Sequence, residues 1–152
     1  MNPARVFKVK NRLAQIVRVP GGKTVAEAVR KADSRIETLR ESTVASFQDQ
    51  VARLSQQAEV GRAQPDTALK ALYRTANDIF SLAGVFGYHG LGEAAYGLCD
   101  LAQRYGEEGP VNWPAIDVHI DGIRLLASPD CDNVEVVLQG LRDVRARVLS
   151  GA

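Results

Sequence analysis

Histidine is the side chain that most often serves as a general base or a metal ligand near neutral pH, and this chain of 152 residues contains two histidines. His89 and His119 lie far apart in the sequence and belong to no motif with the spacing of a metal site. The two cysteines, Cys99 and Cys131, suggest neither a zinc motif nor a disulfide framework. We therefore expect no metal site and no cofactor. His119 is expected to pack at the edge of a core.

The string Gly21-Gly22-Lys23-Thr24 ends like a phosphate-binding loop. Such a loop needs an earlier glycine at a fixed distance and a strand before it, and neither is present here. We expect no nucleotide-binding site at this position.

The strongest functional signal lies between Ala76 and Tyr88, which read ANDIFSLAGVFGY. This stretch resembles the phosphorylation-site helix of histidine-phosphotransfer domains, above all the version at the start of chemotaxis kinases. That pattern runs alanine, histidine, any residue, aliphatic, lysine, glycine, any residue, alanine, glycine, any residue, phenylalanine, glycine, aromatic. The residues that match are Ala76, Ile79, Ala83, Gly84, Phe86, Gly87 and Tyr88, and Leu91 matches the next core leucine.

Three departures from the pattern decide what the resemblance implies. Asn77 stands where the phosphorylated histidine belongs, Phe80 replaces the lysine, and Ser81 replaces the glycine. A carboxamide nitrogen is not a nucleophile, so we expect no phosphotransfer and no enzyme activity at this helix. The framework would remain as a docking face for a receiver domain or a chemotaxis histidine kinase. That predicted face consists of Asn77, Phe80, Ser81, Arg74, Tyr73 and Gly84.

Helical spacing supports an exposed position for this face. The core stripe of the helix is centred between Ala76 and Ile79, so Asn77 should point into solvent on the side that carries Lys70, Arg74 and Ser81. Phe80 and Tyr73 should lie at the boundary between that side and the core.

A second, shorter resemblance lies between Leu13 and Val29, which contain PGGKTVAEA. This segment is similar to the start of CheE-type accessory proteins of alphaproteobacterial chemotaxis operons, which implies a chemotaxis setting.

Two other functions stay open. The chain could be a working phosphotransferase that uses His89, or a structural helical module that forms a homodimer by burying the stripe from Phe47 to Ala58. Close-packed bundles also contain alanine and glycine at helical spacing without any phosphotransfer role.

The elements that position these residues are helices. Apolar residues recur every three or four positions, and Pro and Gly separate the segments. Thr24 and Glu27 form a capping-box pattern at the start of the first helix. The predicted fold is an all-α, up-down antiparallel bundle: a phosphotransfer-like four-helix core with a long first helix and an extra C-terminal helix. The predicted helices span about 25–60, 66–87, 89–106, 113–127 and 132–149, within a bundle over 24–152 that follows a basic arm at 1–23.

Charge and hydropathy narrow the classes of partner. The formal net charge is +1, and no apolar run approaches the roughly 20 residues of a membrane span. Residues 1–24 carry six basic residues and no acid, so the 18 acidic residues all lie beyond them. We expect a cytoplasmic protein that binds neither nucleic acid nor membrane.

Overall fold

The computed structural model describes residues 21–107, 110–128 and 130–150, so nearly all of the predicted basic arm at 1–23 lies outside the described residues. The described residues form helices and no strand, which confirms the all-α fold class. No helix among them is long and apolar enough to cross a membrane. The helices are α2 (Val25–Thr38), α3 (Arg40–Gly61), α4 (Pro65–Phe86), α5 (His89–Glu107), α6 (Trp113–Leu126) and α7 (Val134–Ser150).

The long first helix predicted over 25–60 is wrong, because the structure has two helices there, α2 and α3, with a break at Leu39. The Thr38 hydroxyl donates to the Ser34 carbonyl at 2.7 Å and to the Arg35 carbonyl at 3.1 Å. The hydroxyls of Ser42 and Thr43 both donate to the Leu39 carbonyl at 2.8 Å. Hydroxyl side chains that bond the backbone in this way compete with helical hydrogen bonds and bend helices.

The chain divides into two compact units at this break, 1–38 and 39–152. In the first unit, the predicted capping box at the start of α2 is confirmed. The Thr24 amide donates to the Glu27 carboxylate at 2.8 Å, and the Glu27 amide donates to the Thr24 hydroxyl at 3.2 Å. These bonds lower the pKa of Glu27. Helix α2 has no buried residue, and Val25 and Val29 are exposed.

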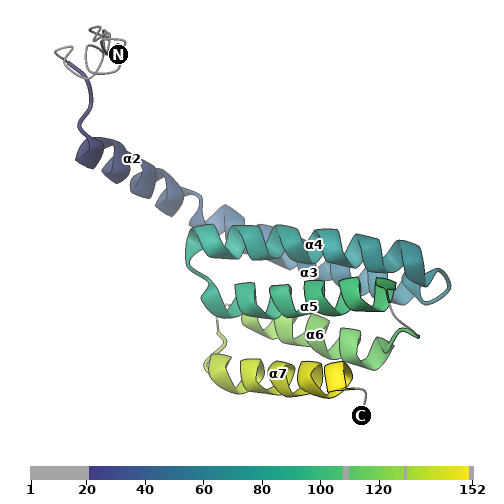
Figure 1. The fold of residues 1–152 in the computed structure, drawn as a ribbon. Coiled ribbons are helices and arrows are strands. Elements are labelled where there is room, and N and C mark those ends of the chain that lie inside the picture. The colour runs from purple at the N-terminus through teal and green to yellow at the C-terminus, as the bar shows by residue number, and fades with distance from the viewer. Residues whose placement is uncertain (1–20, 108–109, 129, 151–152) are drawn as a thin grey trace, which may run out of the picture. The chain divides into compact units, whose positions relative to one another are not determined.

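The second unit is a bundle in which α3, α4, α5 and α6 form a closed ring. Helix α4 packs against α3 and α5, and α6 completes the ring by packing against α5 and α3. Helix α7 lies against α5 and α6, outside this ring. Consecutive helices from α3 to α7 run in opposite directions (Figure 1), as their short connections require. The up-down arrangement with an additional C-terminal helix is therefore as predicted.

The core of the bundle is made of the apolar stripes of its helices. The stripe from Phe47 to Ala58 on α3 is at most 3% exposed and packs inside its own bundle. The proposed homodimer through this stripe is therefore wrong, since those side chains are unavailable to a second copy. The largest side chains with less than 2% exposure are Phe47, Leu54, Leu72, Ile79, Leu98, Leu101, Ile116, Ile123 and His119.

Helix ends fix the position of α4 in the bundle. Pro65 occupies the first turn of α4, where its missing N–H costs no hydrogen bond. Gly87 ends α4 in the left-handed conformation, with φ of 77°, and its N–H donates to the Ala83 carbonyl. Asn112 caps α6, since its side chain accepts from the Ala115 amide at 3.1 Å.

Candidate docking face on helices α4 and α5

The six residues predicted to form the docking face are all exposed on one side of α4. Tyr73 is 40% exposed and Phe80 is 44% exposed, in agreement with their predicted boundary position. The opposite side of the helix is inaccessible: Ala76 and Ile79 are 0% exposed. Packing of this buried side against the core sets the orientation of α4 about its own axis, so that Asn77 and Gly84 face solvent.

Asn77 lies near the middle of this face, and its side chain makes no hydrogen bond within the described part of the chain. Its backbone carbonyl accepts a bond of 2.8 Å from the Ser81 hydroxyl, which holds Ser81 against the helix. The Asn77 carboxamide can offer a partner both a donor and an acceptor, but it has no nucleophilic nitrogen.

An aromatic pair extends the face onto α5. The rings of Phe80 and Tyr96 lie 5.9 Å apart with a tilt of 49° between their planes. A methyl group at Gly92 of α5 would lie 3.6 Å from the Ala83 methyl carbon and 3.9 Å from the Phe80 ring. Tyr96 is 54% exposed. Sequence reasoning missed Tyr96, although an aromatic residue outside the Leu91–Leu98 stripe was a usable signal.

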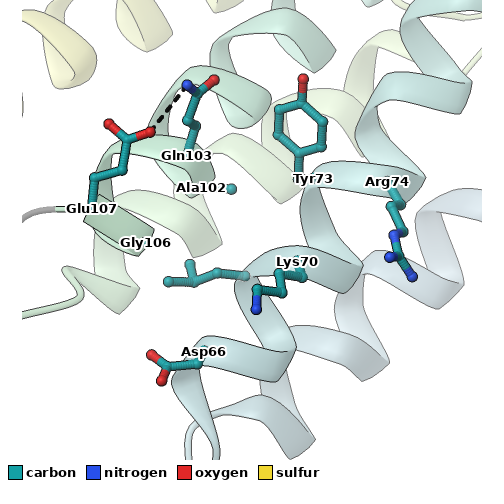
Figure 2. A pocket seen from close by; sticks show the side chains of 9 residues that line it. Asp66, Lys70, Tyr73, Arg74, Ala102, Gln103, Gly106 and Glu107 are labelled. Carbon is teal, nitrogen blue, oxygen red and sulfur yellow. Dashed lines mark hydrogen bonds between the residues drawn. The ribbon is translucent and has the colours of Figure 1, made fainter.

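A hollow of about 630 Å³ continues the face toward the first turns of α4 (Figure 2). Leu69 and Ala102 lie at its floor, and both are 2% exposed. Lys70 and Tyr73 point into the space between the two helices in Figure 2, while Arg74 stands at its outer edge. The lining residues are Asp66, Leu69, Lys70, Tyr73, Arg74, Ala102, Gln103, Gly106 and Glu107.

The acidic residues on the other side of α5 are paired with α7. Arg142 forms two bonds to the Glu93 carboxylate, of 2.6 and 2.9 Å, and lowers the pKa of that carboxyl. Arg142 also donates to Glu135 at 2.6 Å. Arg145 lies 3.9 Å from the Asp100 carboxylate. These acids therefore serve the contact between α5 and α7.

Neither histidine belongs to the predicted face. His89 is exposed at the first position of α5. His119 is 1% exposed, with its Nδ1 2.9 Å from the Ala115 carbonyl oxygen, and burial lowers its pKa. A methyl group at Gly97 would lie 3.3 Å from the His119 ring, so the absent side chain at Gly97 leaves room for the imidazole.

Two further observations concern nucleophilic and metal chemistry. Cys99 is buried beside the Tyr73 carbonyl, with its Sγ at 3.7 Å, and burial raises the pKa of its thiol to about 11. Such a thiol stays protonated and unreactive near neutral pH. No group of three or more metal-ligating side chains occurs within 21–107, 110–128 and 130–150.

Comparison with known proteins adds no assignment: no protein-family model, no curated protein and no solved structure matches this chain.

Proposed function

We propose that this protein is a non-catalytic adaptor of the histidine-phosphotransfer type in bacterial two-component or chemotaxis signalling. It docks a receiver domain or a histidine kinase, in the cytoplasm, through the α4–α5 face around Asn77. The observation that carries the proposal is the exposed position of Asn77 on a helix of the four-helix ring. A histidine that exchanges a phosphoryl group with a partner would have to be exposed in the same position.

The side chains of the face suit binding rather than catalysis. Asn77 provides no nucleophile, and Phe80 brings a ring where a cation would stabilise the charge of a transferring phosphoryl group. Exposed aromatic residues are the type most enriched at the energetic centres of protein interfaces. The adaptor therefore occupies the docking surface of its partner and competes with true phosphotransfer.

Calorimetric titration against the receiver domains and the kinase of the same operon tests this proposal. We expect binding of about micromolar affinity, and its loss in Phe80→Asp. The matched control is Val136→Asp on α7, where the wild-type side chain is 71% exposed. If Val136→Asp weakens a confirmed complex as much as Phe80→Asp does, the docking face lies elsewhere.

A gain-of-function variant tests the same geometry by chemistry. The double variant Asn77→His, Phe80→Lys restores the nucleophile and the neighbouring cation to the exposed side of α4. We expect it to take up acid-labile phosphate from a phosphorylated receiver, while the unaltered protein takes up none. Acid-labile phosphate on the unaltered protein that disappears in His89→Ala would instead identify a working phosphotransferase.

A further inference from the structure

We propose that the hollow between α4 and α5 receives an acidic segment of the partner protein. In this arrangement, an apolar side chain of the partner covers the floor of the hollow and a carboxylate pairs with Lys70 and Arg74. The inference rests on the proposed function, because it specifies the partner chemistry of the same face.

The floor of the hollow fits an apolar side chain. Leu69 and Ala102 are almost fully buried members of the core, and both also line the hollow. Gly106 leaves the α5 side of the hollow without a side chain, and a methyl group at that position would meet no atom within 4 Å. A leucine or methionine of a partner would therefore enter without displacing any group of this protein.

The charges around the hollow favour an acid beside that apolar side chain. Lys70 and Arg74 are exposed one turn apart on α4, and neither forms an ion pair with another described residue. The nearby acids of α5, Glu93 and Asp100, face Arg142 and Arg145 of α7 instead.

The two acids of the hollow itself lie at one end of it. Asp66 belongs to the first turn of α4, where the helix dipole favours a negative charge. Glu107 accepts a bond of 3.3 Å from the Gln103 amide. The cations thus lie toward Asn77 and the acids away from it. This polarity orients an acidic segment, with its carboxylate on the Asn77 side.

An amphiphilic anion tests this chemistry without the partner. The probe is 8-anilinonaphthalene-1-sulfonate, and its control is the uncharged N-phenyl-1-naphthylamine, which has the same ring system. We expect the anion to bind with a Kd on the order of 0.1–1 mM. Its binding is measured by fluorescence and by amide shifts in ¹⁵N NMR spectra. The shifts should centre on Tyr73 and Gln103. The uncharged control should bind more weakly.

Two variants and two matched controls locate the site. Lys70→Glu combined with Arg74→Glu should weaken probe binding by about fivefold or more, since two cations are replaced by repulsive charges. Gly106→Leu should fill the hollow and abolish binding. Gly140→Leu places the same side chain at an open helical glycine on α7 and should bind the probe normally. Val136→Asp should also retain probe binding, because Val136 is exposed on α7 and does not line the hollow.

The outcomes separate this inference from the proposed function. Equal affinity for the charged and uncharged probes, shifts centred elsewhere, or no binding below about 2 mM would each overturn the acidic-segment proposal. If a partner complex is lost in Phe80→Asp but unaffected by Gly106→Leu and by the Lys70, Arg74 double variant, the adaptor function stands and the hollow is not its contact. If the probe binds as expected but no receiver domain or kinase binds, the proposed function is wrong. The hollow would then still be a binding site for apolar anions.

Discussion

At the scale of single residues, small changes of side chain decide what this molecule can do. Asn77 and a reactive histidine would occupy the same exposed position, but only the imidazole can carry a phosphoryl group. His119 shows the converse: it has the right chemistry, but burial at 1% exposure removes it from solvent. Exposure and residue type must therefore coincide before either residue is functional.

Burial of His119 predicts a specific dependence of stability on pH. Its folded-state pKa is lowered by burial, so below the unfolded value of about 6.5 the unfolded chain takes up the proton more readily. The contribution of the neutral, buried imidazole to the free energy of unfolding is therefore fully present above about pH 6.5. It is lost as the pH falls toward the folded-state pKa of His119. Thermal melting at about pH 7.5 and 5.5 should show a smaller fall in Tm for His119→Gln than for the wild type.

His89→Gln is the matched control for that experiment, because it removes an exposed histidine at the first position of α5. It should keep the wild-type dependence of Tm on pH. If it flattens the dependence as much as His119→Gln does, the buried imidazole is not its source.

At the scale of helices, close approach depends on positions without a side chain. A methyl group at Gly61 would overlap the Ala68 methyl carbon and would lie 3.6 Å from the Trp113 ring. Gly61 therefore does more than end α3: it lets the end of α3 touch the first turns of α4. The general rule that glycine separates helical segments covers the first role and not the second, because the neighbour across the turn is set by packing.

Alanine at two helical glycines should have opposite effects on the free energy of unfolding. Gly61→Ala should lower it by about 1–3 kcal/mol, since the backbones of α3 and α4 must separate. Gly140→Ala meets no atom within 4 Å and should raise it by roughly 0.5–1 kcal/mol, because alanine restricts the unfolded chain and favours helix. Urea denaturation of both variants measures the difference. A stabilised Gly61→Ala would contradict the close approach.

The sequence predicted the bundle helices well because their stripes are unbroken. Leu69, Leu72, Ala76 and Ile79 follow steps of three and four, and the structure buries all four. It did not place the break at Leu39, where hydroxyl side chains bond the backbone and the helix is interrupted. The α4 part of the candidate face followed from helical spacing. Tyr96 and the hollow did not, since they depend on how α5 lies against α4.

At the scale of the whole molecule, the break at Leu39 separates two units of different character. The bundle beyond it buries a continuous core, whereas α2 buries no residue of its own. An amphipathic helix with an exposed stripe gains little stability from packing within its own unit.

Residues 39–152 should therefore fold without the preceding segment. We expect this fragment to melt in one cooperative transition, with a Tm within about 3 °C of the full chain. Circular dichroism measures both quantities. A larger fall in Tm would mean that residues 1–38 stabilise the bundle through contacts that burial in α2 does not reveal.

The exposed carboxamide at Asn77 also has a genetic consequence. Asparagine and histidine codons differ only in their first base, so one point mutation places an imidazole at the centre of the face. Phenylalanine and lysine codons differ at every base, so the cation that would assist phosphotransfer at position 80 is not within similar reach. Populations carrying this gene would thus sample the nucleophile repeatedly, but without the cation that the phosphotransfer pattern places at position 80.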